Sequence, residues 1–149
     1  NVLFDRSSHE AIALIDWDTI QAGSFLSDFG DMVRSMTPSF SEDESDTSKV
    51  HLEVPLFEGL VRGFVPTIRS VLSPVEKENL LQGAFWIILE QMMRFLGDYL
   101  NGDQYYKIQY PEHNIVRARN QMALYQSIVE KEEELQQILA KHLQINTKA

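Results

Sequence analysis

Two carboxylates placed two residues apart are the part of this sequence best suited to chemistry. Asp16 and Asp18 follow the apolar run 11–15 and flank Trp17. Alternate side chains of a β-strand share a face, so an extended chain here would put both carboxylates on one side, roughly 7 Å apart. Magnesium prefers one or two carboxylates together with waters and substrate phosphates. The spacing is therefore typical of a divalent-cation site, and a surface hairpin with an acidic end is the alternative.

Two short strands would have to position these carboxylates. Residues 2–4 and 11–15 are apolar runs with β-branched members, and the polar, turn-like segment 5–10 lies between them. This pattern predicts a β-hairpin. Trp17 would point away from the face of Asp16, so we expect it to pack rather than to stack on a ligand.

Helical patterns fill most of the remaining chain, and the sequence predicts one mostly α domain over 1–149 with a short hairpin at its N-terminus. The first expected helix begins near Ser27 or Asp28. Three more are expected over 52–71, from 73 to the Asn101-Gly102 pair, and over about 113–142. Residues 73–76 read Ser-Pro-Val-Glu, which is a capping box with proline at the first helical position. The helix that follows is apolar nearly all round and should be buried at the centre of the domain.

One segment between the helices is rich in serine and acidic residues. Residues 37–49 hold a single aromatic side chain. Such a segment buries too little surface to offset its ordering entropy, so we expect a mobile loop.

The composition excludes several function classes. A net charge of -9 disfavours sequence-independent nucleic-acid binding. The chain has no cysteine, which rules out disulfides, thiolate metal sites and a cysteine nucleophile and fits a reducing cytoplasm. No charge-free apolar run is long enough to span a bilayer, so we expect neither nucleic acid nor membrane as a partner.

The order of these motifs resembles the aminoglycoside phosphotransferase and choline kinase superfamily, which has the protein-kinase-like fold. The matching segments are Asn-Val-Leu-Phe-Asp over 1–5, Ala-Leu-Ile-Asp-Trp-Asp over 13–18, and Asp-Phe-Gly-Asp-Met over 28–32. Asn1 matches the last residue of the family's His-x-Asp-x-x-x-x-Asn catalytic loop, and Asp16 matches its metal-binding aspartate. The resemblance implies a C-terminal lobe in which Asn1 and Asp16 hold Mg²⁺ on the phosphates of ATP. Asp28 resembles the aspartate that braces the catalytic loop, and Asp18 is a possible second carboxylate.

A second resemblance concerns the substrate that would accept the phosphate group. Residues 28–34, 94–107 and 113–121 are similar to the anomeric N-acetylhexosamine kinases. This similarity implies that Arg94 and Tyr105 contact a small sugar substrate. The alternative is that Arg94 forms an ion pair with Glu90 or Asp98, each four residues away on one helix face.

Two further side-chain expectations are structural. Arg34 should pair with Asp31 in preference to reaching a ligand. The histidines show no metal-ligand spacing and are expected to be surface or capping residues; they are His9, His51, His113 and His142.

The resemblance implies a fragment of an ATP-dependent kinase that transfers the γ-phosphate to a sugar hydroxyl, the anomeric one of an N-acetylhexosamine. Its catalytic aspartate would lie five positions before Asn1 and the nucleotide-covering lobe further upstream, so this chain alone should be inactive and prone to self-association. One alternative is a non-catalytic binding module built on the same helical lobe. Another is a hydrolase that uses Asp16 and Asp18 as an acid/base pair.

Overall fold

A small antiparallel hairpin opens the chain. The computed structural model describes residues 2–18, 20 and 22–144. Strand β1 (Val2–Phe4) pairs with β2 (Ala11–Leu14), with Val2 opposite Leu14. Asp5 closes the turn by accepting hydrogen bonds from the amides of Ser7 and Ser8, each 2.8 Å long. The predicted hairpin is confirmed, although its second strand ends one residue earlier than expected.

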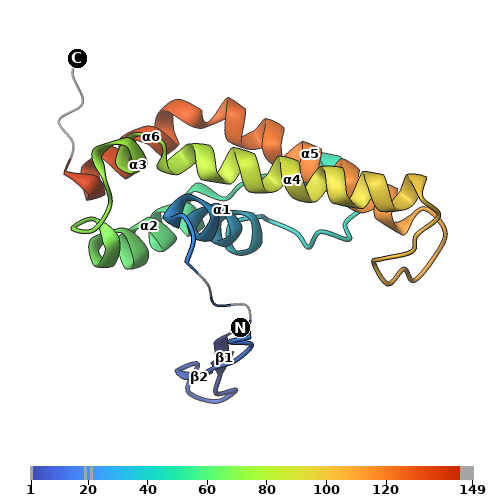
Figure 1. Ribbon diagram of the computed structural model, residues 1–149, viewed down its shortest axis with the longest axis horizontal. Coiled ribbons are helices and arrows are strands. Elements are labelled where there is room, and N and C mark those ends of the chain that lie inside the picture. Colours follow the sequence, from blue (N-terminus) through green and yellow to red (C-terminus); the bar gives the residue numbers. More distant parts are fainter. Residues whose placement is uncertain (1, 19, 21, 145–149) are drawn as a thin grey trace.

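Six α-helices among the described residues form the body, and the predicted class, mostly helical with an N-terminal hairpin, is confirmed. They are α1 (Phe25–Met36), α2 (Val54–Ile68), α3 (Pro74–Glu78), α4 (Leu80–Leu100), α5 (His113–Glu130) and α6 (Glu132–Leu143). Figure 1 shows α4 and α5 running alongside each other, with α1 and α2 across one side and the hairpin projecting away from the helices.

Some helix boundaries differ from the predicted ones because polar side chains bond to nearby groups. The first helix begins at Phe25, earlier than predicted, since the Ser24 hydroxyl accepts from the Leu26 amide at 3.2 Å. The helix predicted after residue 73 is two helices, because Asn79 leaves the helical conformation and its Nδ2 donates to the Val75 carbonyl at 2.8 Å. The last predicted helix is likewise interrupted, at Lys131. The capping box of Ser73 and Glu76 is present as predicted.

The hydrophobic core occupies the part of the body where α1, α2, α5 and α6 meet the first half of α4. Its largest fully buried apolar side chains are Phe29, Leu52, Phe57, Leu80, Leu81, Ile88, Leu124, Ile128, Leu135 and Leu139. The second half of α4 exposes Met93 and Leu100, which are 60% and 74% accessible. Trp86 in the first half is also 53% exposed, so α4 buries one face along its length and the prediction of a helix buried nearly all round is wrong.

Two glycines set how closely α1 and α4 approach. A Cβ added to Gly30 would overlap the backbone of Gly83, and a Cβ added to Gly83 would overlap the carbonyl of Leu26. The helices therefore contact each other backbone to backbone, which no larger residue permits.

The segment between α1 and α2 follows a defined course over the body. It contains an isolated bridge between Pro38 and Leu52 and a 3₁₀ turn, η1 (Thr47–Lys49). Its mobility stays a prediction, and its contacts with α5 are described below. Within the described part of the chain, every helix is too short or too polar to cross a bilayer.

Candidate functional site

A buried carboxylate near the end of α4 organises the most promising site. Asp98 is only 8% exposed. Its Oδ1 accepts from the Tyr105 amide at 2.8 Å, and its Oδ2 accepts from the Tyr106 amide and the Asn114 side chain, both at 2.9 Å. Burial raises the pKa of Asp98, but these hydrogen bonds outweigh burial and hold the pKa below its ordinary value. One charged group thus ties the loop after α4 to both α4 and α5.

An open pocket of about 410 Å³ lies beside this carboxylate. It is lined by Met93, Arg94, Gly97, Asp98, Asn101, Tyr105 and Tyr106. The guanidinium carbon of Arg94 lies 5.8 Å from the ring centre of Tyr105 and 5.6 Å from that of Tyr106. These distances allow cation–π attraction. The structure therefore brings together the two residues that the sequence predicted to contact a sugar.

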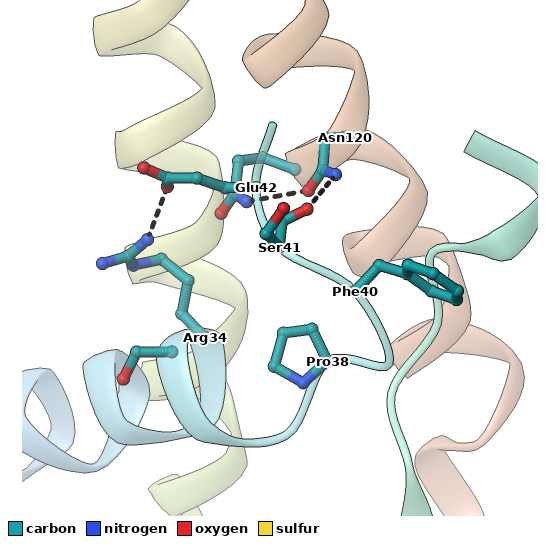
Figure 2. Close-up of a pocket in the computed structure, with 8 residues that line it drawn as sticks. Arg34, Pro38, Phe40, Ser41, Glu42 and Asn120 are labelled. Atoms are coloured by element: carbon teal, nitrogen blue, oxygen red, sulfur yellow. Dashed lines mark hydrogen bonds and ion pairs between the residues drawn. The ribbon is translucent and has the colours of Figure 1, made fainter. Parts of the chain in front are cut away.

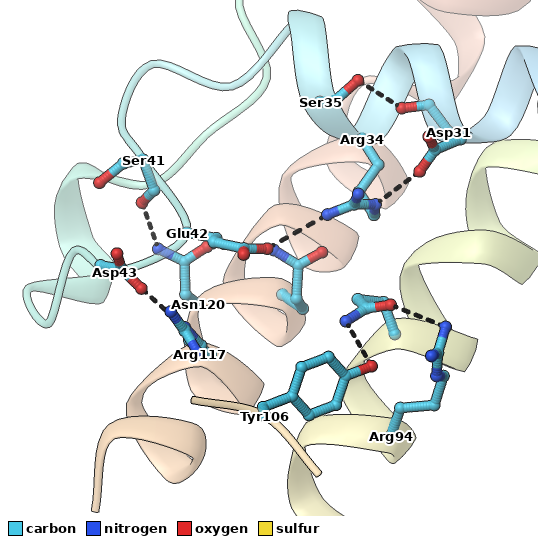
Figure 3. A network of polar contacts seen from close by, with 12 residues as sticks. Asp31, Arg34, Ser35, Ser41, Glu42, Asp43, Arg94, Tyr106, Arg117 and Asn120 are labelled. Carbon is cyan, nitrogen blue, oxygen red and sulfur yellow. Dashed lines mark hydrogen bonds and ion pairs between the residues drawn. The ribbon is translucent and has the colours of Figure 1, made fainter. Parts of the chain in front are cut away.

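Gln91 links two of the residues that line this pocket, Tyr106 and Arg94. Its Nε2 donates to the Tyr106 hydroxyl at 3.1 Å, and its Oε1 accepts from Arg94 Nη1 at 3.5 Å. Figure 3 labels the two partners, Tyr106 and Arg94. Among the ion pairs of the described residues, none joins Arg94 to Glu90 or Asp98. The alternative reading of Arg94 as an i,i+4 ion-pair residue is thus wrong, and its guanidinium faces the pocket-lining aromatic rings.

The chemistry of this pocket suits a neutral polar ligand with an apolar face. Tyr105 is 74% exposed, so its ring is available for stacking. Arg94 offers several N–H donors to hydroxyl or carbonyl oxygens. A ring with equatorial hydroxyls presents both kinds of surface.

The predicted metal residues of the hairpin are arranged differently from the expectation. Asn1 lies outside the described residues, so the predicted Asn1–Asp16 pair does too. Asp16 lies beyond the end of β2 in the left-handed conformation, with φ of 68°, and Asp18 lies in a turn. The chain turns here because Trp17 Nε1 donates to the Leu14 carbonyl at 2.8 Å. The prediction that Asp16 and Asp18 alternate along one strand face is therefore wrong.

This correction removes the strand geometry that the hydrolase alternative required. The predicted packing of Trp17 is also not seen, because Trp17 is 58% exposed. Across residues 2–18, 20 and 22–144, no three histidine or carboxylate side chains gather as a metal site.

Two other predicted residues lie on α1. Asp28 is exposed in the first turn of α1, while Ser24 and not Asp28 caps the helix. The structure does not test its bracing role, which stays a prediction. The predicted pair of Arg34 with Asp31 is confirmed at 3.0 Å, and Arg34 also reaches Glu42 at 3.2 Å.

Sequence reasoning missed a polar cluster at the start of α5. His113 is fully buried, which corrects the prediction of a surface or capping residue. Its Nδ1 accepts from the Gln109 amide at 3.2 Å, so its Nε2 carries the proton shared with Asp43, 2.8 Å away. Arg117 donates to the same Asp43 oxygen at 2.7 Å. Burial raises the pKa of Asp43, but the hydrogen bonds from Arg117 and His113 hold the pKa below its ordinary value.

Asn120 continues this cluster one turn further along α5. Its Nδ2 donates to the Ser41 carbonyl at 3.0 Å (Figure 3) and to the Glu44 carbonyl at 3.2 Å. The spacing of His113, Arg117 and Asn120 places all three on one helix face, and this was the signal in the sequence that could have identified the cluster.

A comparison with models of known protein families found no match for this chain.

Proposed function

We propose that this chain is the acceptor-binding lobe of an ATP-dependent small-molecule kinase that transfers the γ-phosphate to a sugar hydroxyl, the anomeric hydroxyl of an N-acetylhexosamine. The single observation that supports the proposal is that Arg94 and Tyr105 line one pocket. The resemblance implies that both residues contact a sugar, and the loop held by Asp98 brings Tyr105 to the same pocket as Arg94.

Each pocket residue has a distinct task in this proposal. The guanidinium of Arg94 donates to a ring hydroxyl or to the acetamido carbonyl of the sugar. The exposed ring of Tyr105 covers the apolar face of the sugar. Asp98 is a positioning residue in this proposal, because its oxygens accept from the amides of Tyr105 and Tyr106 and so hold those residues against α4.

Magnesium and ATP complete the proposal. Carboxylate and amide oxygens are ligands that Mg²⁺ accepts, so the exposed carboxylate of Asp16 and the side chain of Asn1 suit the cation. The bound cation would neutralise the charge of the transferring phosphoryl group. The base that deprotonates the sugar hydroxyl is expected from an aspartate five positions before Asn1.

A non-catalytic binding module is the second candidate, and one observation favours it. The Arg94 pocket is lined only by α4 and by residues 101–106 and takes no residue from the hairpin. Sugar binding could therefore persist without phosphate transfer.

Binding is tested by titrating N-acetylglucosamine into the chain by calorimetry. Arg94→Ala and Tyr105→Ala should each weaken binding roughly 10-fold or more, the usual consequence of removing a hydrogen bond from a charged group or a stacking ring. Arg119→Ala, which removes an exposed arginine from α5, is the matched control and should leave the affinity unchanged. Equal binding by Arg94→Ala and the unmodified chain would contradict the proposed pocket.

Phosphate transfer separates the two candidates. In a polypeptide that includes the expected upstream aspartate, Asp16→Asn should lower kcat by roughly 100-fold or more, with Glu10→Gln, an exposed carboxylate of the hairpin turn, as the control. Sugar binding without Mg²⁺-dependent ADP release, in the presence of that aspartate, would identify the binding module instead.

A further inference from the structure

Two of the polar residues that line a second pocket are already bonded to their neighbours. This pocket, of about 260 Å³, lies where the end of α1 meets the following segment and α5, and Figure 2 shows Arg34 paired with Glu42 there. Asn120 donates to two backbone carbonyls of that segment and accepts from Gln121 Nε2 at 3.3 Å. One face of α4, in contrast, is apolar and is left uncovered by the rest of the described chain.

The apolar residues on this face of α4 follow a regular spacing. They lie alternately three and four residues apart, and four of the five are exposed while Leu89 is partly buried. We call these five residues the α4 stripe: Trp86, Leu89, Met93, Leu96 and Leu100. An alternation of three and four residues keeps side chains on one helix face, and it is the spacing by which two α-helices pack along each other. The stripe therefore fits a second helix with the same spacing.

Helix α5 extends this apolar surface along one side of the stripe. The rings of Phe85 and Tyr125 pack there, with their centres 5.1 Å apart. Met122 and Val129 lie one turn on either side of Tyr125, and both are exposed. With the stripe, the exposed parts of these side chains amount to roughly 600 Å² per copy, so a symmetric pair would bury about 1,200 Å², the lower end of the range for specific interfaces.

The charge of the chain favours a neutral contact surface for self-association. The net charge of -9 makes two copies repel each other, and the repulsion is smallest where the facing surfaces carry no net charge. The α4 stripe contains no charged residue, and one acidic and one basic side chain flank it, Glu90 and Arg94. Two copies that meet on this face therefore add no net charge to the interface.

We propose that a second copy of this chain docks on the α4 stripe, with the two α4 helices antiparallel about a two-fold axis. An axis near residue 91 sets Leu89 opposite Met93 of the second copy and Trp86 opposite Leu96 of the second copy. The stripe is then complementary to itself. The proposal assigns to one helix face the self-association expected from the sequence, and it does not depend on the proposed kinase activity.

Sedimentation equilibrium of the unmodified chain across the micromolar range tests the dimer. We expect a reversible monomer–dimer equilibrium. Met93→Lys places a charge in the middle of the stripe and should weaken the dimer by roughly 100-fold, because the charge would be buried without a partner. Leu56→Lys makes a similar change at an exposed residue of α2 and should leave the dimer unchanged. A chain that stays monomeric throughout, or a dimer that persists in a folded Met93→Lys protein, would overturn the proposal.

A pair of opposite charges tests the antiparallel arrangement. Trp86→Glu and Leu96→Lys should each be monomeric alone, with circular dichroism confirming that both are folded. Mixed in equal amounts, they should form a heterodimer, because Glu at position 86 then faces Lys at position 96. Two folded variants that stay monomeric when mixed would refute this register.

Salt and lipid distinguish the proposed occupant from others. Added NaCl should tighten the dimer, because it screens the repulsion between the two acidic chains and leaves the apolar contact intact. Weakening by salt would mean that ion pairs hold the copies together, against the proposal. Phosphatidylcholine vesicles should not bind the chain. Vesicle binding that Met93→Lys abolishes would assign the stripe to a lipid surface instead.

Discussion

The hairpin and the loop after α4 both carry residues predicted to function, but they are held in different ways. All residues of β1 and β2 are exposed, and the turn between them depends on Asp5 bonding to the nearby amides of Ser7 and Ser8. The loop after α4 is held by a buried carboxylate, Asp98, that also bonds to α5 through Asn114. Hydrogen bonds within the turn determine the shape of the hairpin alone, whereas a buried carboxylate shared between α4 and α5 also fixes where the loop lies on the helical body. The difference predicts that the loop depends on the helical body and the hairpin does not.

The largest effect should come from the contact between α1 and α4, which tests that dependence. Gly83→Ala places a Cβ against the Leu26 carbonyl, and we expect it to lower the free energy of unfolding by about 3 kcal/mol. Chemical denaturation measures this change, and hydrogen exchange should show faster exchange in the loop as well as in the core. Gly63→Ala in α2 is the control, since no atom lies within 4 Å of its added Cβ. It should be neutral or stabilising by up to about 1 kcal/mol.

The next effect concerns the anchor of the loop. Asp98→Asn keeps the shape of the side chain but sets an amide N–H₂ against donors that now bond to a carboxylate. Hydrogen exchange at Tyr105 and Tyr106 should accelerate strongly, and N-acetylglucosamine affinity should fall roughly 10-fold. Protection in the hairpin should not change. Retained protection at both tyrosine amides would show that the loop does not depend on this carboxylate.

The same anchor predicts a pH dependence. The pKa of Asp98 is lowered in the folded protein, so its stabilising contribution is fully present above the unfolded value of about 3.9. The contribution is lost as the pH falls through the lower, folded value. The difference in Tm between the unmodified chain and Asp98→Asn should therefore be constant near neutral pH and should shrink below about pH 4. A difference that grew in acid would contradict this assignment.

A smaller effect is expected where the segment between α1 and α2 meets α5. Arg117→Ala removes the bond to Asp43, and we expect a loss of about 0.5–1 kcal/mol because Asp43 is 43% exposed. Hydrogen exchange over 38–46 should become faster, while Arg119→Ala on the same helix should change nothing. If this segment already exchanges freely in the unmodified chain, the predicted mobility of 37–49 is confirmed and its contacts with α5 do not order it.

The smallest global effect should come from the hairpin. Asp5→Ala removes the acceptor for both turn amides, so NMR should show loss of the strand pairing between Val2 and Leu14. The Tm of the helical body should not change. A lower Tm would mean that the hairpin and the body unfold together, and the contrast between the two regions would fail.

The sequence allowed prediction of the elements whose signals are local. Hydrophobic periodicity located the helices, and the capping box at Ser73 and Glu76 marked a real helix start. Asn79 and Lys131 were not recognised as breaks, because each interrupts an otherwise continuous helical pattern with a single residue. Arg94 and Tyr105 were identified through a resemblance and lie together in the structure.

The polar contacts between distant segments could not be predicted in this way. Asp98 was considered as an ion partner for Arg94, yet it binds backbone amides seven and eight residues ahead. His113 meets Asp43 across seventy residues of sequence, a separation that no local pattern indicates. The orientation of Gln121 depends in turn on two backbone carbonyls of a segment expected to be mobile. Such networks are determined by the packing of helices, which sequence periodicity describes only in outline.

The way in which Asp98 holds its loop has a consequence for how selectivity could be changed. The carboxylate grips residues 105 and 106 through their main-chain amides, which every amino acid except proline possesses. The Tyr105 side chain, which is 74% exposed, can therefore be exchanged without loosening the loop, whereas Tyr106 also contacts Gln91 and Phe95 through its side chain. Libraries randomised at Tyr105, with Asp98, Tyr106 and Asn114 kept constant, should yield mostly folded proteins that differ in what they bind. The loop after α4 is thus a suitable place to change ligand selectivity by substitution.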